Sequence, residues 1–312
     1  MRKAWTYFWL LGLIWGSSFL FIRIAVENQD LRPVEVVFIR TTIAAIGLGA
    51  VIAWRRVPLP RTRRMITALV VVGLGNVVAP FMLITWGEQY ISSSIAAVMQ
   101  STAALFSLVV AHFMFVDERM TPQRVSGLIV GFVGVVVLFG DKLSGGTIDS
   151  DVAGLAAIVV ASLCYAIFTG LGRKIIQSEV KPIVVAFGSM ASAALATAPF
   201  ALFTEGGFTP LLHSLPSNVV LSVVLLGFFN TFIAYIFYYE IVRQLGASRA
   251  AMVTYIVPAV GLVLGWLILG ETVGISLLIG GTLIMTGIGI VNLRPSRLYR
   301  RLRPQATLPI NQ

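Results

Sequence analysis

The chain has 312 residues, of which 57% are hydrophobic and only 12% are charged. Soluble domains carry about 25% charged residues, so this composition excludes a soluble protein and predicts a chain folded in a lipid bilayer. A net charge of +10 would suggest a nucleic-acid partner in a soluble protein, whereas in a membrane protein it reports which loops face the cytoplasm. One cysteine, Cys164, excludes an internal disulfide, and two histidines argue against a catalytic metal centre. We therefore expect no metal, no cofactor and no nucleic-acid partner.

Apolar runs separated by charged or turn-forming clusters predict ten membrane-spanning helices, because each span needs about 20 apolar residues. The first run follows Arg2 and Lys3 as a signal peptide would, but it is too long and ends without a small-residue cleavage pattern, which indicates a retained helix. Short connections around Glu88 and Glu271 leave eight or nine spans as the alternative. The predicted spans cover residues 5–26, 34–54, 66–86, 91–115, 123–140, 152–172, 183–203, 217–239, 247–269 and 274–292.

The positive charges predict the topology. Nineteen of the 23 Lys and Arg residues fall on one side of the membrane in this arrangement, and only Arg23, Arg32, Arg40 and Lys142 fall on the other. Because positively charged loops stay in the cytoplasm, both termini are expected to be cytoplasmic in a multi-pass protein of the cell membrane. The basic tail, residues 294–312, is expected to anchor this topology, with contact to anionic lipid headgroups as the alternative.

The sequence also contains a weak internal repeat. Glu118 in "FVDER" and Glu271 in "ILGET" lie 153 residues apart at the ends of matching segments. Two halves of five helices follow, residues 1–140 and 141–293, and because five is odd the second half enters the membrane from the opposite side. Inverted repeats of this kind occur in secondary transporters, whereas chance matching of small residues is the alternative. Further pairs at offsets of 149–154 are Trp15 and Tyr165, Pro33 and Pro182, Asn76 and Asn230, Ala97 and Ala250, Met99 and Met252, Gly127 and Gly280, and Gly134 and Gly287.

These features together resemble a known family. The ten spans combine with "WGSSF" in the first helix, "FIR" at 38–40, and the openings "SSSIAAVM" and "GASRAAM" of the fourth and ninth helices. A Glu follows each of those two helices, and this order of short motifs in two copies is similar to the EamA family of the drug/metabolite transporter superfamily. The resemblance covers essentially the whole chain. It implies an exporter or facilitator of small metabolites, often amino acids, with a central cavity lined by the first, third, fourth, sixth, eighth and ninth helices.

Two prolines mark candidate positions along a substrate path. Asn76 and Pro80 lie on one face of the third helix together with Gly73 and Gly87. Proline removes a backbone hydrogen bond that lipid cannot replace, so the kink at Pro80 should face protein or a wet cavity. The same reasoning applies to Pro258 in the ninth helix. For both prolines the alternative to substrate contact is a purely structural kink.

Polar and aromatic side chains at mid-depth supply further candidates for substrate binding. Gln100 stands in a stripe of small residues on the fourth helix, where its buried amide needs partners, although the stripe as a whole favours helix packing. Trp15 and Tyr165, which are related by the repeat, lie mid-helix rather than at the headgroup belt, so they line the cavity or pack in the core. The remaining candidates are Asn230, Tyr235, Tyr238 and Tyr255.

Few charged side chains lie at apolar depth. Arg40 lies six residues, or about 9 Å, inside its helix, where it must snorkel to water, pair with Glu88 or Glu35, or meet an anionic substrate group. Glu88 and Glu240 could accept a coupling proton if burial raised their pKa, with simple solvation at the span ends as the alternative. Glu118 and Glu271 are expected to be structural residues at helix ends, and His112 of an inner helix end to be packed or snorkelling.

The sequence therefore predicts an all-α integral membrane protein that transports small metabolites, most plausibly amino acids or related compounds, out of the cytoplasm by alternating access. Efflux of drugs or toxic compounds by the same fold is the alternative. An integral membrane enzyme acting on lipid would need clustered His, Asp or Lys at one interface, and none occurs, so no catalytic residue is expected. A receptor or assembly subunit is disfavoured because no extramembrane domain is predicted. Partners are a small-molecule substrate and the bilayer, and a monomer is preferred over a homodimer through Gly127 and Gly131.

Overall fold

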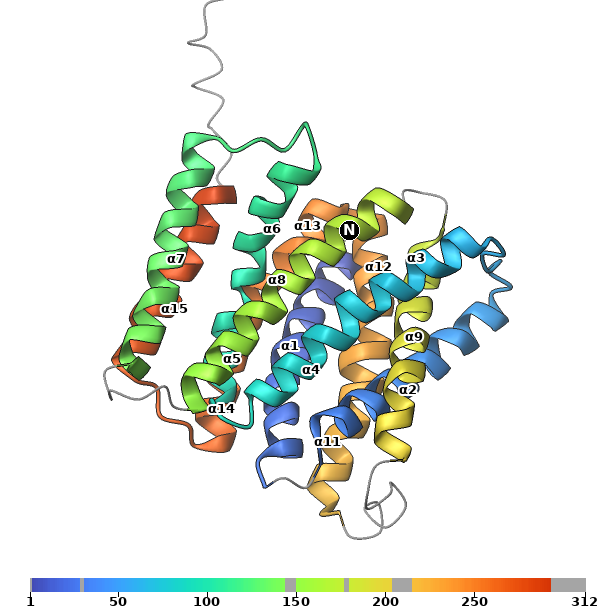
Figure 1. Ribbon diagram of the computed structural model, residues 1–312, viewed down its shortest axis with the longest axis horizontal. Helices are drawn as coiled ribbons and strands as arrows, with labels where there is room; N and C mark the ends of the chain where they lie inside the picture. Colours follow the sequence, from blue (N-terminus) through green and yellow to red (C-terminus); the bar gives the residue numbers. More distant parts are fainter. Residues whose placement is uncertain (1, 29–30, 144–149, 177–179, 204–214, 293–312) are drawn as a thin grey trace, which may run out of the picture.

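The structure is a computed structural model that describes residues 2–28, 31–143, 150–176, 180–203 and 215–292. These residues form helices joined by short connections (Figure 1). The basic tail expected at residues 294–312 lies outside the described residues. The elements of the first half are α1 (Arg2–Val26), α2 (Pro33–Trp54), α3 (Arg63–Gly73), η1 (Leu74–Val78), α4 (Ala79–Gly87), α5 (Ser93–Gln100), α6 (Thr102–Met114) and α7 (Pro122–Leu143). Those of the second half are α8 (Ser150–Ile176), α9 (Pro182–Leu202), α11 (Ser217–Gly227), η2 (Phe228–Ile233), α12 (Ala234–Leu245), α13 (Ala247–Ala251), η3 (Met252–Tyr255), α14 (Ile256–Leu269) and α15 (Ile275–Asn292).

The helices confirm the predicted number of membrane spans. Within the described residues, ten helical segments are long and apolar enough to cross a membrane, so the alternatives of eight or nine spans are wrong. Most ends agree with the prediction within three residues, but the eighth span continues to Leu245 rather than ending at 239. Its last turns carry Glu240 and Arg243, which are polar enough to interrupt an apolar run yet fit well within a helix. Hydropathy therefore located the spans and underestimated one polar helix end.

Four spans depart from a regular α-helix. The third and eighth spans each contain a π-helical segment, η1 and η2, with wider turns than an α-helix. Asn76 and Asn230 lie in these two segments, at positions that the sequence repeat matches. The fourth span is interrupted at Ser101, and the ninth span contains the 3-10 segment η3. The irregular segments thus occur in spans that the repeat matches: the third span with the eighth, and the fourth span with the ninth.

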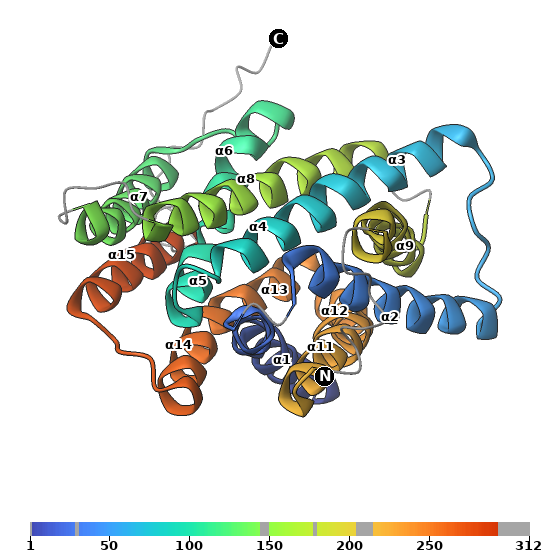
Figure 2. The same ribbon diagram turned by 60° about the horizontal axis from the view of Figure 1, so that its bottom comes forward.

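Helix packing follows the same correspondence. Figures 1 and 2 show α7 and α15, the fifth and tenth spans, side by side at one end of the molecule, and α2 packed on α9, the second and seventh spans, towards the other. Between them α1 packs against α12 and α14, while α8 packs against α4 and α6. The first span therefore contacts the eighth and ninth, and the sixth span contacts the third and fourth. Each contact has a counterpart when the first five spans are exchanged for the last five.

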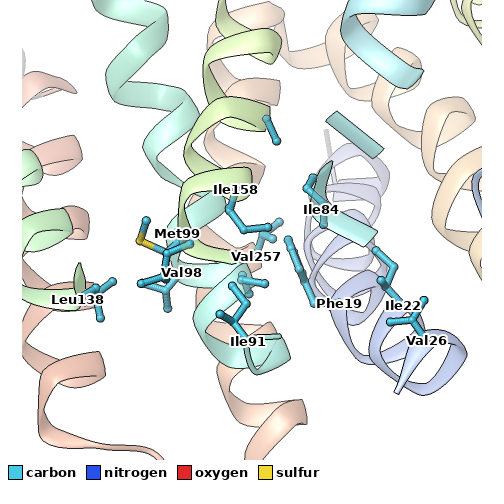
Figure 3. Packing of buried hydrophobic residues seen from close by; sticks show 14 of the residues in the cluster. Phe19, Ile22, Val26, Ile84, Ile91, Val98, Met99, Leu138, Ile158 and Val257 are labelled. Atoms are coloured by element: carbon cyan, nitrogen blue, oxygen red, sulfur yellow. The ribbon is translucent and has the colours of Figure 1, made fainter. Parts of the chain in front are cut away.

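The main apolar core lies where these helices meet. Figure 3 shows Phe19 and Ile22 of α1, Ile84 of α4, Ile158 of α8 and Val257 of α14 converging in this cluster. Met99 and Leu105 of the fourth span are fully buried in it. Lipid supplies no hydrophobic driving force between helices, so close packing of such side chains holds the bundle together.

Close packing of α7 on α15 depends on glycine. A Cβ atom on Gly127 would lie 2.6 Å from the carbonyl oxygen of Gly287, and one on Gly134 would lie 2.5 Å from that of Gly280. The repeat matches Gly127 with Gly280 and Gly134 with Gly287, so the two contacts exchange when the halves are exchanged. Gly131 packs against Leu105 in the same way. Gly127 and Gly131, which the sequence analysis considered as a possible dimer contact, therefore pack against helices of their own chain.

Alanine in place of Gly287 is expected to lower the unfolding temperature of the protein in detergent, because its Cβ would lie 2.4 Å from the Gly127 oxygen and would push α15 away from α7. Gly289, on the exposed side of the same helix, is the matched control, since nothing lies within 4 Å of a Cβ placed there. Alanine at Gly289 is expected to leave the unfolding temperature unchanged or to raise it, since alanine favours a helix by about 1 kcal/mol over glycine. Equal shifts at the two positions would contradict the close approach.

Candidate functional site

Among the residues that the structure describes, Arg40 is the one buried cation. It lies on α2, which begins at Pro33, and only 7% of the residue is exposed. Its Nε donates a hydrogen bond of 2.8 Å to Oγ1 of Thr231 in η2, and the guanidinium carbon lies 3.9 Å from the centre of the Phe81 ring. The Thr231 hydroxyl in turn donates to the carbonyl oxygen of Leu226. The π-helical segment thus presents the hydroxyl that holds one edge of the guanidinium.

The salt bridge considered for Arg40 is not formed among the described residues. Glu35 pairs with Arg32 at 2.6 Å and also accepts a hydrogen bond from the Arg32 backbone, so it caps the start of α2. Glu88 is not within ion-pair distance of Arg40, although the two are close enough to interact electrostatically. The guanidinium therefore keeps donors that no carboxylate of the described residues neutralises. Such a charge is costly inside a membrane protein.

Aromatic candidates from three helices gather beside Arg40. Trp15 of α1 packs on Tyr238 of α12 with ring centres 5.7 Å apart, and Tyr239 continues the row to Tyr235 at 5.9 Å. Tyr235 and Tyr165 of α8 both pack on the apolar cluster that contains Phe81, and both lie within electrostatic reach of the guanidinium. The structure thus brings four predicted residues to one region: Trp15, Tyr165, Tyr235 and Tyr238.

The two asparagines of the π-helical segments connect the halves of the chain. Asn230 is 2% exposed, and its amide donates to the Ile14 carbonyl oxygen and to the hydroxyls of Ser17 and Ser18 on α1. Asn76 accepts a hydrogen bond of 3.0 Å from the Thr169 hydroxyl on α8. Each asparagine therefore binds the first helix of the opposite half.

The interrupted helices carry the remaining polar and proline candidates. Gln100 is the last residue of α5, and its side-chain Oε1 is buried without a hydrogen-bond partner among the described residues. Pro80 is buried directly after η1, and Pro258 is buried directly after η3, so each proline adjoins an irregular turn as the kink argument requires. Tyr255 ends η3 and packs on the main core.

The acidic candidates have different surroundings. Glu88, at the end of α4, is 0% exposed, and neither of its carboxylate oxygens has a hydrogen-bond partner among the described residues. Glu240 lies at the far end of α12 in a surface ion pair with Arg243 at 2.6 Å, and it also accepts from Gln244. The Glu240 side chain is still 28% exposed. Glu88 is therefore the buried acid of the two.

Glu118 and Glu271, which the repeat matches, each follow the C-terminal end of a helix, α6 and α14, but their contacts differ. The Glu271 carboxylate accepts hydrogen bonds from the backbone N–H groups of Ser93 and Ser94 at 2.7 and 2.9 Å, and from the Ser94 hydroxyl. It thereby caps α5 and joins the end of α14 to the start of the fourth span. Glu118 instead pairs with Arg173 on α8, on an exposed part of the molecule. His112 accepts a hydrogen bond from the Met120 backbone, which makes it a packed helix-end residue.

Sequence reasoning missed three features of this region. Thr231 gave no signal as a partner of Arg40, since the two lie 191 residues apart. The eighth span, which contains the π-helical segment η2, has no proline that would have signalled an irregular turn, whereas the third span has Pro80. The break at Ser101 had a weak signal in two consecutive hydroxyl residues, because Ser101 and Thr102 bond back to the carbonyls of Val98 and Met99.

Comparisons with known proteins agree with this architecture. The model of the EamA-like transporter family matches the chain twice, over residues 3–140 and 152–293. An "Uncharacterized transporter" of Archaeoglobus fulgidus is 29% identical over 93% of this chain and 98% of its own length. A "Probable amino-acid metabolite efflux pump" of Salmonella typhimurium is 26% identical over 94% of this chain and 96% of its own length. A crystal structure that is 21% identical superposes with a TM-score of 0.63, covering 97% of this chain and all of that one, which shows the same fold.

The two matches of the family model fall on the two halves predicted from the internal repeat. The relatives are named transporters or efflux pumps and not enzymes, in agreement with the absence of a predicted catalytic residue. With ten membrane-spanning helices and a family match over nearly its whole length, this chain is a member of the EamA-like transporter family.

Proposed function

We propose that this protein is a secondary transporter that exports amino acids or related small metabolites from the cytoplasm by alternating access. Membership of the EamA-like transporter family supports transport in general. Relatives named amino-acid metabolite efflux pumps in Salmonella typhimurium and Escherichia coli support both the export direction and the substrate class. Their similarity extends over more than nine tenths of this chain.

Arg40 is the observation that carries the substrate class. A buried guanidinium without a carboxylate partner is suited to bind the carboxylate that every amino acid brings, and a fork of N–H donors fits that group well. The row formed by Trp15, Tyr238, Tyr239 and Tyr235 offers an apolar surface with hydroxyl groups at its edge for the substrate's side chain. The substrate is therefore expected to be zwitterionic rather than a simple cation.

The paired architecture supports alternating access. The Gly127 to Gly287 and Gly134 to Gly280 contacts exchange with the halves of the chain, as does the pairing of the other spans. Inverted repeats allow two states in which the halves exchange their conformations, so that the protein opens to opposite sides of the membrane. The irregular turns in the third, fourth, eighth and ninth spans provide points where these helices can bend.

We place both termini and most Lys and Arg residues on the cytoplasmic side. In this orientation Glu88 and Glu271 lie at the outer end of the bundle, and Glu118 with Arg173 lies at the inner end. The contact of Glu271 with the start of α5 then closes the outer end, and the structure corresponds to a state closed to the outside. Labelling of single cysteines in the two loops that hold residues 59 and 272 with a membrane-impermeant reagent tests the orientation, since only the second is expected to react in intact cells.

Transport itself is tested with purified protein in liposomes. Counterflow of a labelled mixture of the standard L-amino acids is expected in vesicles preloaded with the unlabelled mixture, and competition by single amino acids then identifies the substrate. Protein-free liposomes measure leakage. Competition by decarboxylated amines or lipophilic cations, with none by amino acids, would contradict the proposal and favour efflux of drugs or toxic compounds.

A further inference from the structure

Glu88 is a buried acid that substrate binding at Arg40 leaves unexplained. It directly follows the span that ends at Gly87, and this end of α4 lies so close to α8 that a Cβ on Gly87 would be 3.0 Å from the Gly154 carbonyl oxygen. The Glu88 side chain is 0% exposed, and both carboxylate oxygens lack hydrogen-bond partners among the described residues. Glu35, the other buried carboxylate among the described residues, is hydrogen-bonded.

The charged groups around Glu88 are engaged elsewhere. Arg23 of α1 donates to the Glu88 backbone oxygen at 2.5 Å and pairs with Glu27 at 3.3 Å, so it binds the main chain rather than the carboxylate. Arg40 of α2 is held by Thr231. Glu271, which follows α14, caps α5. Opposite this end of α4, α8 presents Gly154, Ala157 and Ile158, none of which titrates.

These surroundings favour the neutral form of the acid. Burial, and after it the negative charge of Glu271, raises the pKa of Glu88 well above its ordinary value, against a smaller opposing effect of Arg23 and Arg40. Burial and the unpartnered carboxylate oxygens thus both favour the protonated form of Glu88. It loses that proton once water or a cationic group reaches the carboxylate and stabilises its charged form.

A cavity at the proposed outer end of the bundle lies next to the residues that follow Glu88. The residues that follow Glu88, Tyr90 to Ser92, line a cavity of about 340 Å³ together with Glu271 and Asp151. Glu271 forms both the wall of this cavity and the cap of α5, so release of that cap would extend the cavity towards Glu88. Glu88 is also within electrostatic reach of Arg40. The acid is thus close in sequence to residues of the outer cavity and within electrostatic reach of the residue that we assign to the substrate carboxylate.

We propose that Glu88 binds the coupling proton of a proton–substrate exchange. The Glu88 carboxylate takes a proton from the outer side, carries it through the closed state and releases it on the cytoplasmic side, where the ammonium group of an amino acid held at Arg40 takes its place. Per cycle, one proton enters and one zwitterionic substrate leaves. This inference rests on the proposed function, and it adds the coupling ion and the group that carries it.

The test compares accumulation with exchange in proteoliposomes, using the labelled mixture of standard L-amino acids as the probe. With the lumen more acidic than the medium, outward proton movement is expected to make wild-type protein accumulate label several-fold above equilibrium. Glu88→Gln cannot release a proton, but its amide oxygen can still accept a hydrogen bond from the substrate ammonium group. It is therefore expected to lose this accumulation and to keep counterflow without a gradient at reduced affinity. Glu88→Asp keeps the acid and is expected to retain part of the accumulation.

Glu27→Gln is the matched control, because Glu27 is an exposed carboxylate beside Arg23 at the same end of the bundle, and its accumulation is expected to equal that of wild type. Accumulation by Glu88→Gln at the wild-type level would overturn the proposal. So would loss of counterflow in a Glu88→Gln protein that remains monodisperse and as stable as wild type, since this would place Glu88 in substrate binding alone. Wild-type counterflow without accumulation would refute coupling and leave the proposed transport intact, whereas absent counterflow would refute transport itself.

Discussion

Replacing Arg40 with Met is expected to abolish most amino-acid transport and, at the same time, to raise the unfolding temperature of the empty protein. Hydrogen bonds to a charged group contribute about 1.5–3 kcal/mol, so loss of the guanidinium should weaken substrate binding about tenfold to a hundredfold. The rise in stability follows because Arg40 is buried without a carboxylate partner among the described residues, and an apolar side chain of similar length avoids that desolvation cost. Counterflow and thermal unfolding in detergent measure the two effects.

Three comparisons make the Arg40 prediction specific. Arg40→Lys keeps the charge but loses the Nε bond to Thr231 and the planar fork, so an intermediate affinity is expected. Tyramine, which lacks the carboxylate of tyrosine, should inhibit amino-acid transport by wild-type protein no better than it inhibits the residual transport by Arg40→Met. Arg55→Gln, at the exposed end of the same helix, is the control and should leave transport unchanged. A lower unfolding temperature in Arg40→Met would indicate a structural role for Arg40 and contradict carboxylate binding.

The spans could be predicted well from the sequence because each of them must meet the same requirement of the bilayer. A helix of sufficient length and apolar character is required at every crossing, and that requirement is visible in local composition. The pairing of Glu118 with Glu271 and of Gly127 with Gly280 also predicted which helices would correspond, and the packing of α7 on α15 follows that correspondence. Pro80 and Pro258 marked irregular turns because proline removes a backbone donor wherever it stands in a helix.

The surroundings of single polar residues could not be predicted in the same way. Arg40 was recognised as a charge that needs a partner, but the choice among Glu35, Glu88 and a substrate depended on helix rotation and depth, which composition does not record. Asn230 was recognised as a polar residue at mid-depth, whereas its bonds to α1 depend on how η2 packs against that helix. The Ser93 and Ser94 backbone contacts of Glu271 join segments 177 and 178 residues apart. Such contacts arise from the packed bundle and leave no local pattern in the chain.

Glu271→Gln is expected to open the end of the transporter that we propose to face the outside. Both oxygens of the Glu271 carboxylate accept backbone N–H groups at the start of α5, and an amide side chain would offer one acceptor, no charge, and a donor facing a donor. Loss of a charged hydrogen bond costs about 1.5–3 kcal/mol, so the population of the outward-open state should rise about tenfold or more. Gly265 allows the present contact, because a Cβ there would lie 2.3 Å from the Glu271 oxygen, and Gly265→Ala should therefore act in the same direction.

Cysteine accessibility measures this opening. Ile91 is 3% exposed and lines the outer cavity, so in a Cys164→Ser background Ile91→Cys should react slowly with a membrane-impermeant maleimide in intact cells. Adding Glu271→Gln should increase the alkylation rate by about the same factor as the open population. Glu118→Gln is the matched control, since Glu118 is the repeat-related carboxylate at the inner end and bonds to Arg173 instead of a helix start. If both variants, or neither, accelerated alkylation of Ile91→Cys, the contact of Glu271 with α5 could not be what holds the outer end closed.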